Sequence, residues 1–289
     1  MRNVLCLLLV SLSVMLCAGC DKDDNEGMVP AEVLAEFDSM FPKAKHTHWA
    51  DEELYYKVSF VVERIPKTAW FRPSGEWAMT DTDLPAQNLP RPIHTDIAVG
   101  EFSGKRIEKI HSINVPERDD LFIILMDVGR DSLAALYYTR SGNFFKKEFV
   151  KNEVSVRPVD LPQYASETVS GYVGYEVMSV ELESGVMEVC LVSDTDMLSV
   201  ILGFENRSSN PLYEHLVYSW RQLLPEDYPE GLDAVLSGQG LTADDIVRVY
   251  EVYSYGEAFF NVVVRGNDGN TFLRIELAEI ADASAAVMA

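Results

Sequence analysis

The sequence predicts an α+β fold made of tandem repeats, each a short helix followed by an antiparallel meander of three or four strands. Three observations predict it: prolines precede helical patterns at four places, alternating apolar and polar runs follow, and Ser-Gly turns recur between the runs. Because consecutive hairpins favour antiparallel pairing and a helix covers one face of such a sheet, we expect four units paired into two domains. Four loosely strung units are the alternative, but units of roughly 60 residues would be only marginally stable alone.

Four prolines mark the expected helices. Each is followed three and seven residues later by apolar residues, and a spacing of four places such a pair on one helix face. The prolines are Pro30, Pro90, Pro162 and Pro225, and the pairs are Val33 with Phe37, Ile93 with Ile97, Ala165 with Val169, and Tyr228 with Leu232. The helices are short, so we expect them to depend on packing against a sheet.

Alternating residues mark the expected strands, because a period of two gives a sheet one buried and one wet face. The apolar positions in the first, third and fourth units are Tyr56, Val58, Phe60 and Val62; Met178, Val180 and Leu182; and Leu273, Ile275 and Leu277. The second unit is continuously apolar from Leu121 to Met126, as a central strand would be. Segments 71–77 and 138–144 share one pattern of aromatic, two residues, Ser-Gly, one residue, aromatic, which predicts a hairpin turn in each.

The expected domain boundaries follow from these units. They are a signal peptide at 1–19, an acidic tether at 20–29, a first domain at 30–155, a second domain at 156–280 and a tail at 281–289. The first domain contains units at about 30–85 and 89–155, and the second contains units at about 160–222 and 224–280. The break between the domains is placed near Val154 to Leu161, where Arg157-Pro158 interrupts the pattern.

The first 19 residues have the features of a signal peptide. Arg2 precedes an apolar run, Val4 to Leu16, that is too short to span a bilayer. The following Cys17-Ala18-Gly19-Cys20 resembles the lipobox of bacterial lipoproteins, although that motif usually has Leu where this chain has Cys17. The resemblance implies that Cys20 is the first mature residue and carries a lipid anchor in the membrane. Ordinary cleavage by signal peptidase, with Cys20 unmodified, is the alternative.

The acidic segment after Cys20 bears on the location. Asp21 to Glu26 cannot bury itself and forms a solvated tether. It resembles the export signal of Bacteroidetes lipoproteins, which implies the outer membrane and exposure at the cell surface. In enteric bacteria, an Asp directly after the cysteine would instead imply retention in the inner membrane. Both readings place the protein in the cell envelope.

Composition excludes two classes of protein. With 46 acidic against 24 basic residues and a net charge of −22, no nucleic-acid partner is expected, because such binding needs clustered Lys and Arg. A hydrophobic content of 47% is too high for a disordered chain. Cys190, in an apolar run, is expected to be a small core residue, and a reactive thiol or an intermolecular disulfide is the alternative.

Residues 30 to 90 resemble a known family. The similarity rests on the segments Phe41-Pro42-Lys43-Ala44, Trp49, Tyr55-Tyr56-Lys57-Val58-Ser59-Phe60, Ala69-Trp70-Phe71 and Gly75-Glu76-Trp77. They are similar to the PepSY-like, β-lactamase-inhibitor-like lipoprotein domains of Bacteroidetes. The resemblance implies two β-lactamase-inhibitor-like domains, and in the inhibitors that share this fold the outer sheet faces grip a partner protein. No catalytic residues carry over, and inhibition of a β-lactamase does not follow from the fold.

Aromatic residues of the first unit are the candidate binding residues: Trp49, Tyr55, Trp70 and Trp77. Aromatic side chains on a sheet face anchor partner proteins or stack on sugar rings. The alternative is that they fill the core between helix and sheet, as at least one of Trp70 and Trp77 should.

No metal, cofactor or catalytic site is expected. His46 and His48 share a strand face, and such a pair can bind zinc or copper, but a third ligand is needed and Asp51 is no more than an option. Carboxylate pairs such as Asp244-Asp245 are expected to be solvated turns rather than glycosidase or calcium sites. Residues 238–243 match G-x-G-x-x-A, but they follow a helix and precede a strand, which is the reverse of a dinucleotide site.

The sequence therefore predicts a non-enzymatic, lipid-anchored envelope protein that presents curved sheet faces to a protein or glycan. One alternative is a subunit or assembly factor of a surface complex, which an exposed edge strand at Leu121 to Met126 would support. The other is a hydrolase, which a ligand-sized pocket with converging carboxylates would support.

Overall fold

The structure is a computed structural model, and it describes residues 26–129, 132–183, 185–193, 195–205, 216–266 and 269–288. The predicted signal peptide and Cys20 lie outside these residues. The chain forms two compact units, Met1–Thr82 and Asp83–Ala289. The domain boundary expected near residue 155 stays a prediction.

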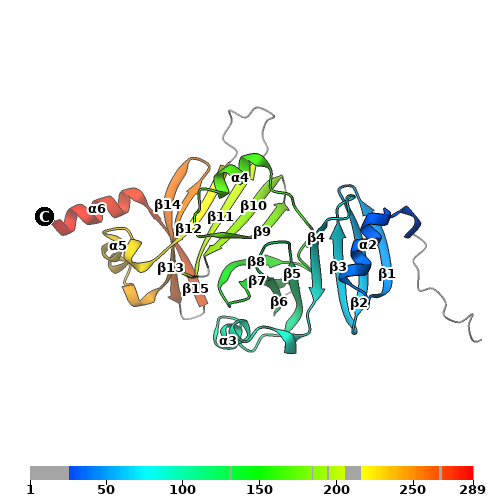
Figure 1. The fold of residues 1–289 in the computed structure, drawn as a ribbon. Helices are drawn as coiled ribbons and strands as arrows, with labels where there is room; N and C mark the ends of the chain where they lie inside the picture. Colours follow the sequence, from blue (N-terminus) through cyan, green and yellow to red (C-terminus); the bar gives the residue numbers. More distant parts are fainter. Residues whose placement is uncertain are drawn as a thin grey trace, which may run out of the picture. The chain divides into compact units, whose positions relative to one another are not determined.

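In the first unit, one helix covers one face of a four-stranded meander (Figure 1). The elements are η1 (Glu26–Met28), α2 (Ala31–Met40), β1 (Lys45–Glu52), β2 (Tyr55–Val62), β3 (Ile65–Phe71) and β4 (Trp77–Asp83). Phe37 of α2 lies at the centre of the core, with its ring 5.3 Å from that of Trp49 and 5.1 Å from that of Phe60. Val33 and Phe37 are both buried, so the spacing of four does place one helix face on the sheet.

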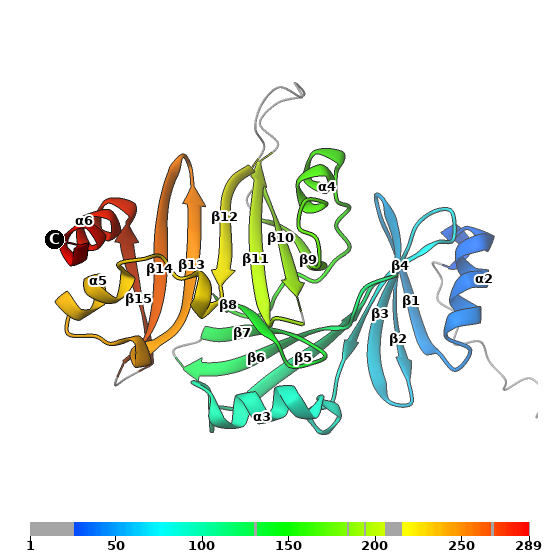
Figure 2. The ribbon, with the colours of Figure 1, turned by 60° about the vertical axis from the view of Figure 1, so that its left-hand side comes forward.

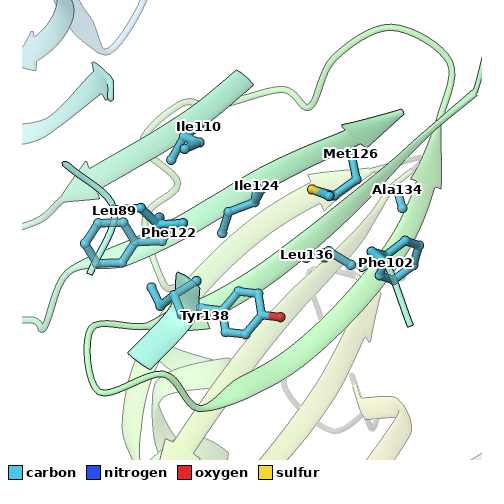
Figure 3. Packing of buried hydrophobic residues seen from close by; sticks show 10 residues of the cluster. Leu89, Phe102, Ile110, Phe122, Ile124, Met126, Ala134, Leu136 and Tyr138 are labelled. Carbon is cyan, nitrogen blue, oxygen red and sulfur yellow. The ribbon is translucent and has the colours of Figure 1, made fainter. Parts of the chain in front are cut away.

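The second unit begins with a helix and four strands. They are η2 (Ala86–Asn88), α3 (Arg91–Val99), β5 (Ile107–Asn114), β6 (Leu121–Gly129), β7 (Ser132–Thr139) and β8 (Phe144–Val150). Side chains from β5, β6 and β7 gather with Leu89 and Phe102 in one apolar cluster (Figure 3). Ile93 of α3 belongs to the same cluster. Residues Leu121 to Met126 are all buried, and β6 pairs with β5 on one side and β7 on the other. The edge-strand observation that would have supported an assembly factor is therefore not found.

The next part of the second unit is α4 (Gln163–Val169) followed by β9 (Glu176–Glu183), β10 (Val186–Ser193), β11 (Leu198–Glu205) and β12 (Leu216–Leu223). Figure 2 shows α4 on one face of these strands, where Ala165 packs with Val189, Leu191, Val200 and Leu202. The opposite face carries Glu181, Glu188, Cys190, Ile201, Tyr218 and Trp220, because cross-strand partners share a face.

The last part holds η3 (Pro225–Asp227), α5 (Leu232–Gly238), η4 (Ala243–Asp245), β13 (Ile246–Ser254), β14 (Glu257–Gly266), β15 (Gly269–Glu276) and α6 (Leu277–Met288). Leu232 and Leu236 of α5 and Ile280 of α6 pack on one face of the strands with Val249, Val262 and Ile275. Residues 281–288, expected as a tail, belong to α6, and Leu277, expected in a strand, begins that helix. None of the helices in the described part of the chain has the length and apolar character needed to span a bilayer.

The predicted fold class is wrong. The chain is not an α+β array of helix–strand units; it is mainly antiparallel sheet with few helices, in two large sheets with the strand orders β1-β2-β3-β4-β5-β6-β7-β8 and β15-β14-β13-β12-β11-β10-β9. The second sheet shows the reason, because β12 pairs directly with β13 although α5 lies between them in sequence, with Tyr218 opposite Ser254. Strand β13 supplies hydrogen-bond partners to the free backbone edge of β12. The sheet therefore continues although α5 lies between these two strands in sequence.

The two Ser-Gly turns have a packing role. Gly75 and Gly142 adopt left-handed φ angles of 90° and 95°. A Cβ at Gly75 would lie 3.0 Å from the Glu32 carbonyl oxygen, and one at Gly142 would lie 2.6 Å from Pro92 Cβ. In each case, glycine lets a hairpin turn approach the first turn of the helix that covers its strands.

Candidate functional site: an aromatic cavity beside a buried lysine

Two of the predicted binding residues lie on the helix-covered face of the first unit. Trp49 is only 2% exposed and belongs to the core around Phe37. Trp77 is half-buried against the same core, and its indole Nε1 donates a hydrogen bond to Thr80 Oγ1 at 3.0 Å. These two rings therefore fill the space between helix and sheet, which was the alternative interpretation of the aromatic residues.

The other two, Tyr55 and Trp70, lie on the opposite sheet face, because Trp70 pairs with Lys57 while its neighbours Ala69 and Phe71 face the helix. Both are buried. The Trp70 indole donates to Glu52 Oε2 at 3.2 Å, and Lys57 Nζ lies 5.7 Å from its ring centre. The binding role of all four aromatic residues stays a prediction.

The two histidines and Cys190 are the other residues that the sequence singled out. His46 and His48 are both exposed on β1, and the described residues contain no group of three His, Cys, Asp or Glu able to hold a metal ion. Cys190 is a fully buried free thiol, and burial raises its pKa. It is buried in the core, as the sequence predicted, and its lack of reactivity stays a prediction.

A cavity of about 360 Å³ lies in the second unit, where the sequence had predicted no site. Its walls come from the end of α3 and from β7, β8, β11, β12, β13, β14 and β15. Seven aromatic side chains line it: Phe102, Tyr138, Phe144, Phe145, Trp220, Tyr250 and Phe272. A volume of this size and a wall with aromatic rings and few polar groups are typical of small-ligand sites.

Strand register explains one wall of the cavity. Trp220 lies opposite Val252, and the rings of Trp220 and Tyr250 are 6.0 Å apart. Val263 lies opposite Phe272 on the neighbouring strands. These residues lie on the sheet face opposite α5 and α6, so the sheet has apolar side chains on both faces.

A buried lysine lies at the border of the cavity. The Lys146 side chain, 10% exposed, places its Nζ 2.6 Å from Glu181 Oε2 and 2.8 Å from Glu188 Oε1. Burial works against the ammonium, but the acidic groups around it raise the pKa of Lys146 above its usual value. Burial also raises the pKa of Glu181. The cluster joins β8 to the hairpin of β9 and β10.

Two tyrosines complete this cluster. Tyr137 donates its hydroxyl to Glu148, and Lys146 Nζ lies 4.7 Å from the Tyr137 ring centre. Tyr218 donates to Glu188 Oε2 at 2.7 Å. The Tyr218 ring occupies the space that a side chain at Gly203 would take, since a Cβ there would lie 2.1 Å from the ring. A second hollow of about 540 Å³ opens over Lys146, Tyr218 and Trp220 and shares lining residues with the aromatic cavity.

One signal in the sequence points to the lysine cluster. In the hairpin of β9 and β10, Glu181 lies directly opposite Glu188. Like charges directly opposite each other destabilise a hairpin, so this pair requires a cation from elsewhere. The cavity gave no comparable signal, because its wall is collected from many strands far apart in sequence.

Comparison with known proteins confirms the family resemblance for part of the chain. Residues 54–146 match the model of the family described as "Putative beta-lactamase-inhibitor-like, PepSY-like". The match includes Tyr55, Trp70 and Trp77 and extends beyond residue 90 into β8. No curated protein matches the chain.

Several solved structures from Bacteroides are similar to part of the chain. A DUF2874 family protein of Bacteroides ovatus is 26% identical, with 43% of this chain and 89% of that chain covered and a TM-score of 0.40. A BLIP-like protein of Bacteroides fragilis is 20% identical, covering 45% and 93%, with a TM-score of 0.41. A protein of Bacteroides eggerthii described as periplasmic is 22% identical, covering 43% and 90%, with a TM-score of 0.40.

Proposed function

We propose that this protein is a non-enzymatic, lipid-anchored binding protein of the cell envelope, and that it holds its partner at the aromatic cavity of the second unit. The cavity is the observation that carries the proposal. Its aromatic rings offer faces on which an apolar side chain of a protein or a sugar ring can stack. The match of residues 54–146 to a β-lactamase-inhibitor-like family supports a protein as the partner.

The charged groups beside the cavity support a binding role over a hydrolytic one. A carboxylate pair that performs acid–base catalysis needs one oxygen free to exchange a proton with a substrate. Here Lys146 contacts Glu181 Oε2 and Glu188 Oε1, and Glu188 Oε2 accepts from Tyr218, so both oxygens of Glu188 are engaged. These contacts use the carboxylates to hold the protein together.

The N-terminal sequence supports the lipid anchor and the envelope location. The experiment is to produce the full chain and its Cys20→Ser variant in a bacterium that processes lipoproteins. We expect the unchanged chain in the membrane fraction, with the mass of a diacylated or triacylated Cys20, and the variant in the soluble fraction. Membrane association of both proteins, without added lipid mass, would contradict the anchor.

Binding at the cavity is tested with a matched pair of surface aromatic residues. Phe272, 54% exposed, lines the cavity, while Tyr255, 62% exposed, lies outside it in the same sheet region. Purified full chain is used to retain proteins and glycans from solubilised envelope of the source bacterium. We expect Phe272→Ser to lose the retained partner and Tyr255→Ser to keep it. Equal retention by both variants would place the binding surface elsewhere.

A further inference from the structure

Arg248 is a cation on the cavity wall. Its guanidinium carbon lies 4.9 Å from the centre of the Phe144 ring, so the side chain is held against an aromatic neighbour. It is half-buried, and among the residues that the structure describes no carboxylate pairs with it. A guanidinium has five N–H donors in a planar fork, and it binds a carboxylate through two parallel hydrogen bonds.

The two other cations of the wall are paired with carboxylates of the protein. Lys147 Nζ lies 2.9 Å from Glu101 Oε2, and Lys146 is held by the glutamates described above. Asp96 accepts a hydrogen bond from the Tyr138 hydroxyl at 2.7 Å. Among the cations of the wall, Arg248 therefore has N–H donors left to bind a ligand. The negative charge of Asp96 works against an anion that enters the cavity.

The rest of the cavity wall favours contact with the apolar part of a ligand. Ile97, Leu136, Ile201 and Val263 join the aromatic side chains around the hollow. Burying apolar surface of a ligand in such a site stabilises binding, because this surface is removed from water. Aromatic rings add stacking to this.

We propose that the cavity binds an apolar group that carries one anionic head, such as an aliphatic or aromatic carboxylic acid, with the head beside Arg248 and the apolar body against the aromatic wall. This inference rests on the proposed function, because it names the chemical class that the same cavity takes. It adds a requirement for negative charge that the proposed function does not contain.

The test compares two fluorescent probes with a similar aromatic body. 8-Anilinonaphthalene-1-sulfonate carries one negative charge, and N-phenyl-1-naphthylamine is neutral. Each is titrated into the purified full chain and into the variants Arg248→Met and Arg265→Met. Arg265 lies on the exposed surface of β14 and serves as the control for loss of a positive charge.

We expect one site for each chain and binding of the anionic probe at least about tenfold tighter than that of the neutral probe, because a charge-assisted hydrogen bond contributes roughly that factor. Arg248→Met should remove this preference and leave the neutral probe within about twofold, while Arg265→Met should leave both unchanged. Decanoate should displace the neutral probe far better than decanol does.

The outcomes separate the two proposals. Single-site binding of both probes with equal affinity, unaffected by Arg248→Met, would overturn the anionic ligand and leave the cavity as a binding site. Binding of neither probe at a single site would overturn the anionic ligand, whereas the proposed function is overturned by equal retention of the partner by Phe272→Ser and Tyr255→Ser. A circular dichroism spectrum of each variant that matches the unchanged chain ensures that the losses are not unfolding.

Discussion

Replacing Lys146 by Met should destabilise the second unit more than any other single lysine substitution near the cavity. Lys146 Nζ contacts Glu181 at 2.6 Å and Glu188 at 2.8 Å, and its side chain is only 10% exposed. Without the ammonium, two carboxylates that lie directly opposite each other lose their counter-charge. Methionine keeps the apolar stem, so the variant isolates the charge.

The magnitude follows from the burial of the three groups. Removing one partner of a buried ion pair costs about 3 to 5 kcal/mol, because the other charge is left buried without a partner. The two glutamate side chains are 28% and 25% exposed, so water screens part of this cost. We therefore expect a loss of about 3 kcal/mol in the free energy of unfolding.

The loss should depend on pH. The pKa of Glu181 is already raised by burial from its ordinary value of 4.5, and removing Lys146 raises it further. A carboxyl whose pKa is raised in the folded state binds its proton more tightly when folded. It therefore favours the folded state at low pH and disfavours it as the pH rises through and above 4.5. The penalty of Lys146→Met should be largest near pH 7.5 and should shrink as the pH falls toward 4.5.

The assay is urea unfolding of the full chain at several pH values, with amide hydrogen exchange of peptides from β8, β9 and β10 to locate the change. Lys147→Met is the matched control, because Lys147 is 19% exposed and contacts one glutamate at 2.9 Å. We expect it to cost about 1 kcal/mol or less. Equal losses for the two variants, or a loss at Lys146 that does not shrink at low pH, would refute the reasoning.

Three further predictions concern the fold. Gly142→Ala should lower the free energy of unfolding by about 2 kcal/mol or more, because φ is positive there and the added Cβ would clash with its neighbours. Gly104 also has a positive φ, but an added Cβ would meet open space, so Gly104→Ala should lose only about 1 kcal/mol in the same urea assay. In a chain with Cys6, Cys17 and Cys20 changed to Ser, the fully buried Cys190 should not react with Ellman's reagent until the chain is unfolded in urea, because burial raises its pKa. Rapid reaction at neutral pH would contradict its burial. Because the pKa values of Lys146 and Tyr137 are raised in the folded state, both groups hold their protons more tightly when folded. The free energy of unfolding should therefore fall above about pH 10 by about 1.4 kcal/mol per pH unit for each group. A flat profile between about pH 10 and 11.5 would contradict this.

Local structure could be predicted where one physical pattern dominates. The spacing of Val33 and Phe37 predicted one buried face of a helix, and α2 has it. The alternation around Val58 and Phe60 predicted which side chains of β2 face the core. These patterns depend on neighbours within about one helical turn or two strand positions, and the sequence displays such neighbours directly.

The arrangement of the strands could not be predicted in the same way. Whether a sheet ends at a helix depends on which backbone edge the following strand meets, and nothing in the sequence around α5 shows that β13 pairs with β12. Likewise, the sequence left open whether Trp70 fills the core, and it could not show that this side chain is buried on the sheet face opposite the helix. Both outcomes depend on contacts between residues far apart in sequence.

The candidate site shows the same limit. The aromatic cavity collects Phe102, Tyr138, Trp220 and Phe272 from separate parts of the chain, and no short motif joins them. The sequence therefore predicted binding residues among the tryptophans of the first unit, which are close together in sequence.

The most direct test of cavity binding is site-specific photo-cross-linking in the source bacterium. Benzoylphenylalanine is introduced at Phe272, on the cavity wall, and at Tyr255, outside it, in otherwise unchanged full chains. The account predicts one discrete cross-linked product from position 272 and none from position 255, and loss of that product when Tyr250, another residue of the cavity wall, is changed to Ala. Equal products from both positions, or a product at position 272 that survives Tyr250→Ala, would contradict binding at the cavity.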